Sequence, residues 1–172
     1  MIAAFLACAA IAAPQTEPFK PTAVFSGTHS QIKKLRFELV EDAAAWRKLW
    51  SEHRGTDRSF TETDQDFEVD FETCRVVCVF TGWTTKPRTT GSVVVNGEIH
   101  VRYDVGSNDF QFRPEPFVDE PQPPHDSKAE DMRGYMFVVV PKGKMPVAVE
   151  EKCLTGRTFK WIVRFPAPPK KN

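Results

Sequence analysis

The fold class follows from one stretch of the chain, residues 93–101, which has the sequence VVVNGEIHV. Asn96 and Gly97 lie between two apolar runs, and this pair is preferred in two-residue hairpin turns because both central residues need a positive φ. After the turn, apolar residues alternate with polar ones as far as Val105, so one side of the second strand is apolar. The stretch therefore predicts a β-hairpin with one buried face.

Further segments on both sides of this hairpin have the alternation or the continuous apolar character of β-strands. They are residues 22–30, 33–40, 71–81, 135–140, 147–154 and 157–165. The long apolar run in 71–81 predicts a central strand, and 135–140 is apolar at positions that belong to both faces. In the last segment an aromatic stripe at a spacing of two is formed by Phe159, Trp161, Val163 and Phe165.

Residues 42–54 have helical spacing instead, with one side formed by Trp46, Leu49, Trp50 and His53. Asp42 is placed to cap the start of this helix, and Gly55 follows its end. His53 near the C-terminal end is favourable for the helix dipole. We therefore predict an α+β fold that is mainly antiparallel β, with one or two packed sheets covered by a single helix.

Length, composition and charge limit the classes of protein to which the chain can belong. Its 172 residues suit one domain, and 41% hydrophobic residues suffice for a core. Because 23 Lys and Arg balance 23 Asp and Glu, we expect no nucleic-acid partner. After the first dozen residues no segment approaches the ~20 apolar residues of a transmembrane span. We predict a β-rich domain at 22–165 with a long proline-rich loop at 106–132, a leader at 13–21 and a disordered tail at 166–172.

The first 12 residues resemble a secretory signal peptide. Residues 2–13 are small and apolar, and residues 10–12, Ala-Ile-Ala, fit a cleavage site. No Lys or Arg precedes the apolar run, so two alternatives stay open: a buried N-terminal helix, and a less favoured lipid anchor at Cys8. Export to the periplasm or the extracellular space is the prediction.

Export changes what the cysteines imply, because thiols in an oxidising compartment tend to pair. Cys74 and Cys78 lie ~13 Å apart on an extended strand, beyond the ~7 Å limit for a disulfide. We predict a disulfide of Cys153 with Cys74 or Cys78. The alternative is that all three are small buried apolar side chains.

Motifs of nucleophilic, phosphate-binding and dinucleotide-binding enzymes are not found in the sequence. We therefore predict a protein that is not an enzyme and needs no cofactor. One combination keeps an alternative open: His125 lies beside Asp126, with Asp131 nearby, which would suit a metal site or a hydrolase.

Two loops contain candidate interaction residues. They are Trp83, Lys86, Arg88, Thr89 and Thr90 in the connection 82–91, and Phe110, Phe112 and Phe117 in the long loop. Aromatic and arginine side chains presented on a scaffold are typical of interfaces, although these rings could instead fold back to close the core. The favoured interpretation is an exported, non-catalytic module for protein interaction or ligand binding. The alternative is a protease inhibitor that inserts the 82–91 loop into a protease cleft.

Several motifs in their order along the chain carry a resemblance. They are Trp46-x-x-Leu49-Trp50, Val69-Asp70-Phe71, Phe80-Thr81-Gly82, Thr89-Thr90-Gly91 before an apolar strand, and the sequence YMFVVVPK at 135–142. Over residues 46–149 the chain resembles the PrcB-like family, which is named for an accessory subunit of a bacterial surface protease complex. The resemblance implies an exported, non-catalytic domain whose partner is another exported protein such as a protease.

Overall fold

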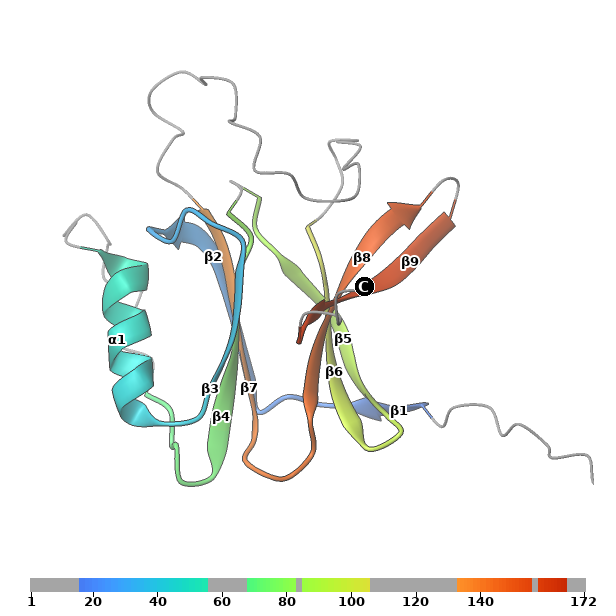
Figure 1. Cartoon of the computed structure of the whole chain (residues 1–172), viewed down its shortest axis with the longest axis horizontal. Coiled ribbons are helices and arrows are strands. Elements are labelled where there is room, and N and C mark those ends of the chain that lie inside the picture. The colour runs from blue at the N-terminus through green and yellow to red at the C-terminus, as the bar shows by residue number, and fades with distance from the viewer. Residues whose placement is uncertain (1–15, 56–67, 83–84, 106–132, 156–157, 167–172) are drawn as a thin grey trace, which may run out of the picture.

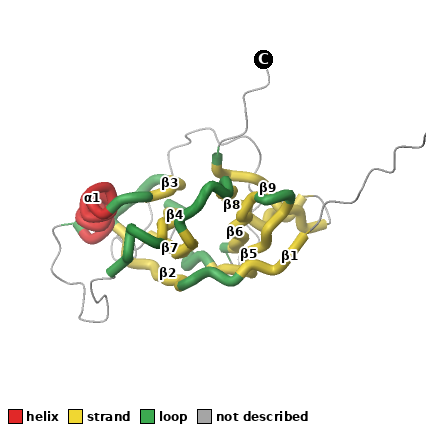
Figure 2. Tube along the Cα trace, turned by 90° about the horizontal axis from the view of Figure 1, so that it is seen from below, coloured by secondary structure: helices red, strands yellow, loops and turns green. Residues whose placement is uncertain are grey.

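Two β-sheets and one helix are stacked in three layers in the computed structural model, which describes residues 16–55, 68–82, 85–105, 133–155 and 158–166 (Figures 1 and 2). Sheet A has the strand order β1-β5-β6-β8-β9, and sheet B has the order β2-β7-β4-β3. Every neighbouring pair is antiparallel except β6 and β8, which are parallel. The predicted fold class is therefore confirmed: mainly antiparallel β, two packed sheets and a single helix.

The strands of sheet A are β1 (Thr16–Phe19), β5 (Arg88–Val95), β6 (Glu98–Asp104), β8 (Val147–Thr155) and β9 (Thr158–Phe165). Those of sheet B are β2 (Ala23–Ser30), β3 (Arg36–Val40), β4 (Cys74–Phe80) and β7 (Arg133–Pro141). The helix α1 spans Ala43–Arg54. Residues 13–21 were predicted to be a leader, but β1 lies within them and pairs with β5, so this part belongs to sheet A.

Sheet B lies between α1 and sheet A, and both of its faces are buried (Figure 2). Its α1-facing cluster includes Val76, Cys78, Phe80, Tyr135, Phe137 and Val139. The residues between these pack against sheet A, namely Val77, Val79, Met136, Val138 and Val140. The two strands that are apolar on both faces, β4 and β7, are neighbours inside sheet B, as their composition predicts.

The Asn-Gly hairpin also forms as predicted. Asn96 and Gly97 have φ values of 51° and 80°, the positive values that a type I′ turn needs. Ile99, Val101 and Tyr103 on the second strand of the hairpin are fully buried between the sheets.

The helix begins and ends at the predicted residues. The Asp42 side chain accepts hydrogen bonds from the backbone N–H groups of Ala44 and Ala45, at 2.9 and 2.8 Å. At the other end, Gly55 has a φ of 63°, and its N–H donates to the Ser51 carbonyl at 3.0 Å. These contacts satisfy backbone groups that a helix leaves without partners at its ends.

Removing the cap is expected to destabilise the protein measurably. Asp42→Ala should lower the free energy of unfolding by about 1 kcal/mol, because two backbone donors lose their acceptor. Chemical denaturation followed by circular dichroism measures the change. Asp42→Asn is the control, since it keeps an acceptor oxygen and should cost less than half as much. Equal losses in both variants would show that capping is not the cause.

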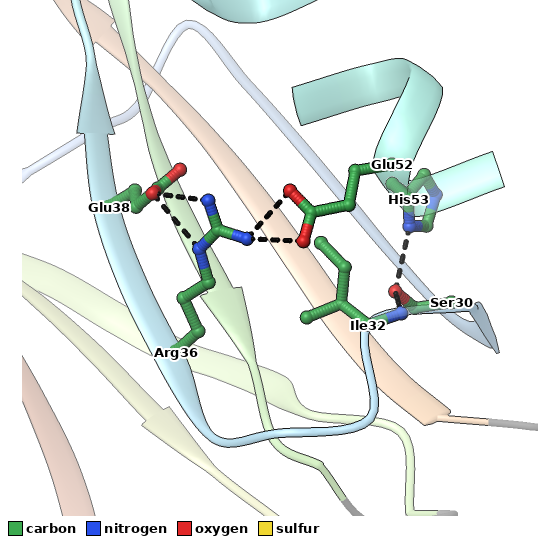
Figure 3. A network of polar contacts seen from close by, with 6 residues as sticks. All are labelled: Ser30, Ile32, Arg36, Glu38, Glu52 and His53. Carbon is green, nitrogen blue, oxygen red and sulfur yellow. Dashed lines mark hydrogen bonds and ion pairs between the residues drawn. The ribbon is translucent and has the colours of Figure 1, made fainter. Parts of the chain in front are cut away.

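The helix is also fixed to sheet B by polar contacts (Figure 3). Arg36 of β3 donates from Nη1 to both carboxylate oxygens of Glu52, at 2.7 and 2.8 Å, and from Nε to Glu38 at 2.9 Å. This cluster is partly exposed, so its main effect is to orient the helix rather than to stabilise the fold strongly.

His53 was expected to interact favourably with the helix dipole, but the structure places its side chain in the core. It is 1% exposed, and its Nδ1 lies 3.0 Å from the Ser30 hydroxyl (Figure 3). Its ring lies 4.3 Å from the ring of Tyr135 and 5.1 Å from that of Phe137. Burial, together with the nearby charge of Arg54, lowers the pKa of His53 from 6.5 to about 4. The imidazole is therefore a neutral core side chain at neutral pH.

The predicted disulfide is not present, because neither Cys74 nor Cys78 is bonded to Cys153. Cys74 and Cys78 belong to the cluster between sheet B and α1, whereas Cys153 lies on β8 of sheet A. Sequence spacing does not show on which sheet or face a cysteine falls. Burial raises the pKa of the Cys78 thiol well above its ordinary value, so this thiol is an apolar core residue.

Candidate interaction surface

The hairpin formed by β8 and β9 has the largest group of exposed apolar side chains in the described part of the chain. Leu154, Phe159, Trp161 and Val163 are 44%, 57%, 36% and 38% exposed, and only three other large apolar residues among those described are comparably exposed. In Figure 1 the far ends of the two strands extend away from sheet B. Exposed apolar groups of this size mark candidate interaction sites.

A bulge decides which way these side chains point. Val149 pairs with Phe165, but Glu150 pairs with Val163, so Arg164 is an extra residue on β9. Phe165 therefore packs against the core between the sheets, whereas Val163 lies opposite Glu150 on the other side of sheet A. The stripe noted in the sequence is thus divided, and its first three members lie on what we call the outer face, the face turned away from sheet B.

The aromatic ring of Trp161 is held by a chain of polar contacts on the outer face. Glu150 accepts hydrogen bonds from His100 at 2.9 Å and from Arg102 at 2.7 Å. The Arg102 guanidinium lies 5.0 Å from the Trp161 ring centroid, a cation–π distance. Burial alone would raise the pKa of Glu150, but the hydrogen bonds from Arg102 and His100 lower it overall. Glu150 therefore stays ionised and fixes the arginine on which the indole stacks.

Phe159 is supported in a similar way near the turn. The ammonium of Lys152 on β8 lies 4.7 Å from the centroid of the Phe159 ring. Lys152 pairs with Trp161 in the strand register, and Leu154 pairs with Phe159. The outer face of the hairpin therefore consists of apolar side chains with cations between them.

The opposite face of the hairpin is held by a buried ion pair. Arg164 donates from Nε to Glu151 at 2.9 Å, and Glu151 is only 2% exposed. A second nitrogen of Arg164 donates to the Cys153 sulfur at 3.4 Å. Burial alone would lower the pKa of Arg164, but Glu151 and Cys153 raise it overall, so the pair is ionic. Contacts on both faces thus order the exposed residues before any partner arrives.

Part of the predicted interaction loop lies at the same end of sheet A. Lys86, Arg88, Thr89 and Thr90 are exposed, and the last three begin β5. Arg88 pairs with Asp104, and the preceding residue of β6, Tyr103, lies beside Glu151 of β8. The structure therefore brings the start of β5 and the hairpin together, with β6 between them.

Other predicted residues lie outside the described part of the chain. These are Cys8 and the whole signal peptide, Trp83, Phe110, Phe112, Phe117, and the alternative site at His125, Asp126 and Asp131. The predicted tail beyond residue 166 also lies outside the described part of the chain.

The β8–β9 surface was not among the sites predicted from the sequence. A signal for it exists: residues 152–165 contain four cations and no acid, although the whole chain has equal numbers of both. Cations alternate there with aromatic residues, a composition favoured at interfaces. The signal was weak because a bulge cannot be seen in the sequence.

Within the described ranges, no group of three or more His, Cys, Asp or Glu side chains could hold a metal ion. No described helix is both long and apolar enough to cross a membrane. Comparisons with protein-family models, curated proteins and solved structures found no match to the chain.

Proposed function

We propose that the chain is a non-catalytic protein-interaction module and that the outer face of the β8–β9 hairpin is its binding surface. The observation that supports this most directly is the exposure of Phe159 and Trp161 on an ordered hairpin. Burying apolar area on binding is favourable by ~25 cal/mol per Å², and aromatic rings offer the largest area per side chain. Tryptophan, tyrosine and arginine are enriched among the residues that dominate binding energy.

The polar contacts beneath the rings add to this argument. Arg102 and Lys152 hold the two rings in place, so little side-chain freedom is lost when a partner binds. The surface combines rigid apolar anchors with cations that can meet an anionic rim. This arrangement suits recognition of another macromolecule better than chemistry on a small substrate.

The proposal includes a location outside the cytoplasm, supported by the apolar run at residues 2–13. The resemblance to the PrcB-like family favours an exported partner such as a protease. Both remain predictions from the sequence.

Loss of binding on removal of the two rings tests the proposal. The double variant Phe159→Ser, Trp161→Ser should bind its partners at least about tenfold more weakly than the native chain, since each ring offers a large apolar contact. Quantitative co-purification from an envelope fraction, after mild crosslinking, measures the change.

A control exists on an edge strand of the other sheet. Val24 and Phe25 on β2 are 37% and 41% exposed, so Val24→Ser, Phe25→Ser removes two exposed apolar side chains away from the hairpin. Binding that survives in the hairpin variant, or falls equally in both variants, would overturn the proposal. Loss only in Lys86→Ala, Arg88→Ala would favour the inhibitor alternative, in which the 82–91 loop makes the contact.

A further inference from the structure

The β9 strand has a free backbone edge as well as exposed side chains. It is the last strand of sheet A, and no described strand pairs with its far side. Natural edges are usually short, irregular or interrupted by proline. Among the other edges, β1 has four residues including Pro18, β3 has five, and β2 has an irregular register between Gly27 and Ser30. From Thr158 to Val163, β9 pairs regularly with β8 and contains no proline.

The free hydrogen-bonding groups belong to the residues that form the outer face. Thr155 pairs with Thr158 across a two-residue connection. Residues that flank such a connection face each other with their backbone groups, and the pattern alternates along the strand. The alternation turns the N–H and C=O groups of Phe159, Trp161 and Val163 away from β8. One set of residues therefore offers both a backbone edge and an apolar row.

The charge of the hairpin limits which strand can occupy that edge. Of the described cations in residues 152–165, Arg164 is neutralised by Glu151. Lys160 has no described carboxylate as an ion-pair partner, and it lies on β9 with its side chain on the face opposite to Trp161. On a strand added beside β9, a carboxylate next to Lys160 would be favourable, and so would an apolar side chain next to Trp161.

We infer that the partner presents an extended, acidic polypeptide segment that adds to β9 as a further strand. This inference rests on the proposed function. Its residues alternate between apolar side chains next to Phe159 and Trp161 and acidic side chains next to Lys160. Main-chain hydrogen bonds supply affinity in this mode of recognition, and the alternate side chains supply specificity.

Two other occupants fit the surface less well. A membrane-inserting element needs apolar side chains where it enters the bilayer, but the connection at residues 155–158 is Thr-Gly-Arg-Thr. A second copy of the chain would bring the same lysines toward one another, which is unfavourable for neighbouring strands.

The test is a titration of the full, isotope-labelled chain with a short synthetic peptide in which glutamate alternates with valine, followed by NMR. We expect saturable shifts of the Thr158–Val163 amides and slower hydrogen exchange at Phe159, Trp161 and Val163. A peptide with lysine in place of glutamate should bind at least about tenfold more weakly. A peptide N-methylated on the edge that pairs with β9 should lose binding, because it cannot complete the ladder.

A charge-reversal variant tests the role of Lys160 directly. Lys160→Glu should weaken binding of the glutamate peptide by about tenfold or more and strengthen binding of the lysine peptide. This exposed substitution tests charge without removing either ring. Thr158→Glu is the position control: it adds an acid to the same strand, and it should have a smaller effect if the carboxylates pair with Lys160 itself.

Each of four other results would overturn the inference: equal binding of the two peptides, binding only to anionic phosphatidylglycerol vesicles, self-association through the β9 amides, or peptide binding only after the acids of residues 106–132 are replaced by amides. The last result would identify the chain's own acidic segment as the occupant. If the Phe159→Ser, Trp161→Ser variant loses its partners while no acidic peptide binds, the proposed function stands and only this inference fails.

Discussion

Phe137→Ala is expected to lower the free energy of unfolding by about 3–5 kcal/mol, the range for removing a buried aromatic ring. Phe137 is 1% exposed and lies where sheet B meets the helix. Its ring centroid is within 6 Å of five other rings, those of Trp46, Trp50, His53, Phe80 and Tyr135. Because domains of this size are generally stable by only ~5–15 kcal/mol, the loss would be a large part of the total.

Phe159→Ala provides the matched control, because it removes the same atoms from a ring that is 57% exposed. We expect it to change stability by less than about 1 kcal/mol, since little apolar area returns to water. Urea or guanidinium denaturation of both variants measures the difference. Similar losses in the two variants would contradict the assignment of Phe137 to the core and of Phe159 to the surface.

The second large effect is a loss of stability in acid that depends on His53. Its pKa is about 4 in the folded protein and 6.5 in the unfolded chain. As the pH falls from 6.5 toward 4, the unfolded chain binds a proton that the folded protein does not, so acid favours unfolding. The stabilisation is complete above pH 6.5, and about 3 kcal/mol of it is lost between pH 8 and pH 4.

Measurements between pH 6.5 and pH 5 isolate this effect, because most carboxylates remain ionised there. Over this interval the native chain should lose about 1.5 kcal/mol more stability than His53→Gln, which cannot titrate. The amide of His53→Gln can still meet the Ser30 hydroxyl. His29→Gln is the control, since it removes a histidine that is exposed rather than buried. An unchanged slope in His53→Gln would show that another group is responsible.

The elements that the sequence predicts well are those defined by local patterns. The Asn96-Gly97 turn and the caps of α1 depend on residues within a few positions of one another, and they form as expected. The continuous apolar character of β7 correctly predicted burial on both faces. In each case the physical cause, a positive φ, a capping oxygen or an apolar run, is present in the residues themselves.

The predictions that failed depend on contacts between distant parts of the chain. His53 was expected to interact favourably with the helix dipole. It is buried instead, in contact with the Ser30 hydroxyl and the ring of Tyr135. The Cys153 disulfide was expected from compartment and spacing, but the topology places Cys153 on a different sheet from Cys74 and Cys78. Burial and strand order are properties of the assembled fold, and no local pattern encodes them.

The β8–β9 surface shows most clearly which features local sequence patterns predict and which depend on the assembled fold. Side chains alternate along any extended backbone, so the sequence is sufficient to predict that Phe159, Trp161 and Val163 share one side of a strand. That this side faces outward while Phe165 faces the core depends on the assembled fold, since the bulge at Arg164 reverses the alternation between Val163 and Phe165. The bulge lies beside the buried contact of Arg164 with Glu151 across the two strands. A cross-strand contact of this kind exists only once β8 and β9 have paired.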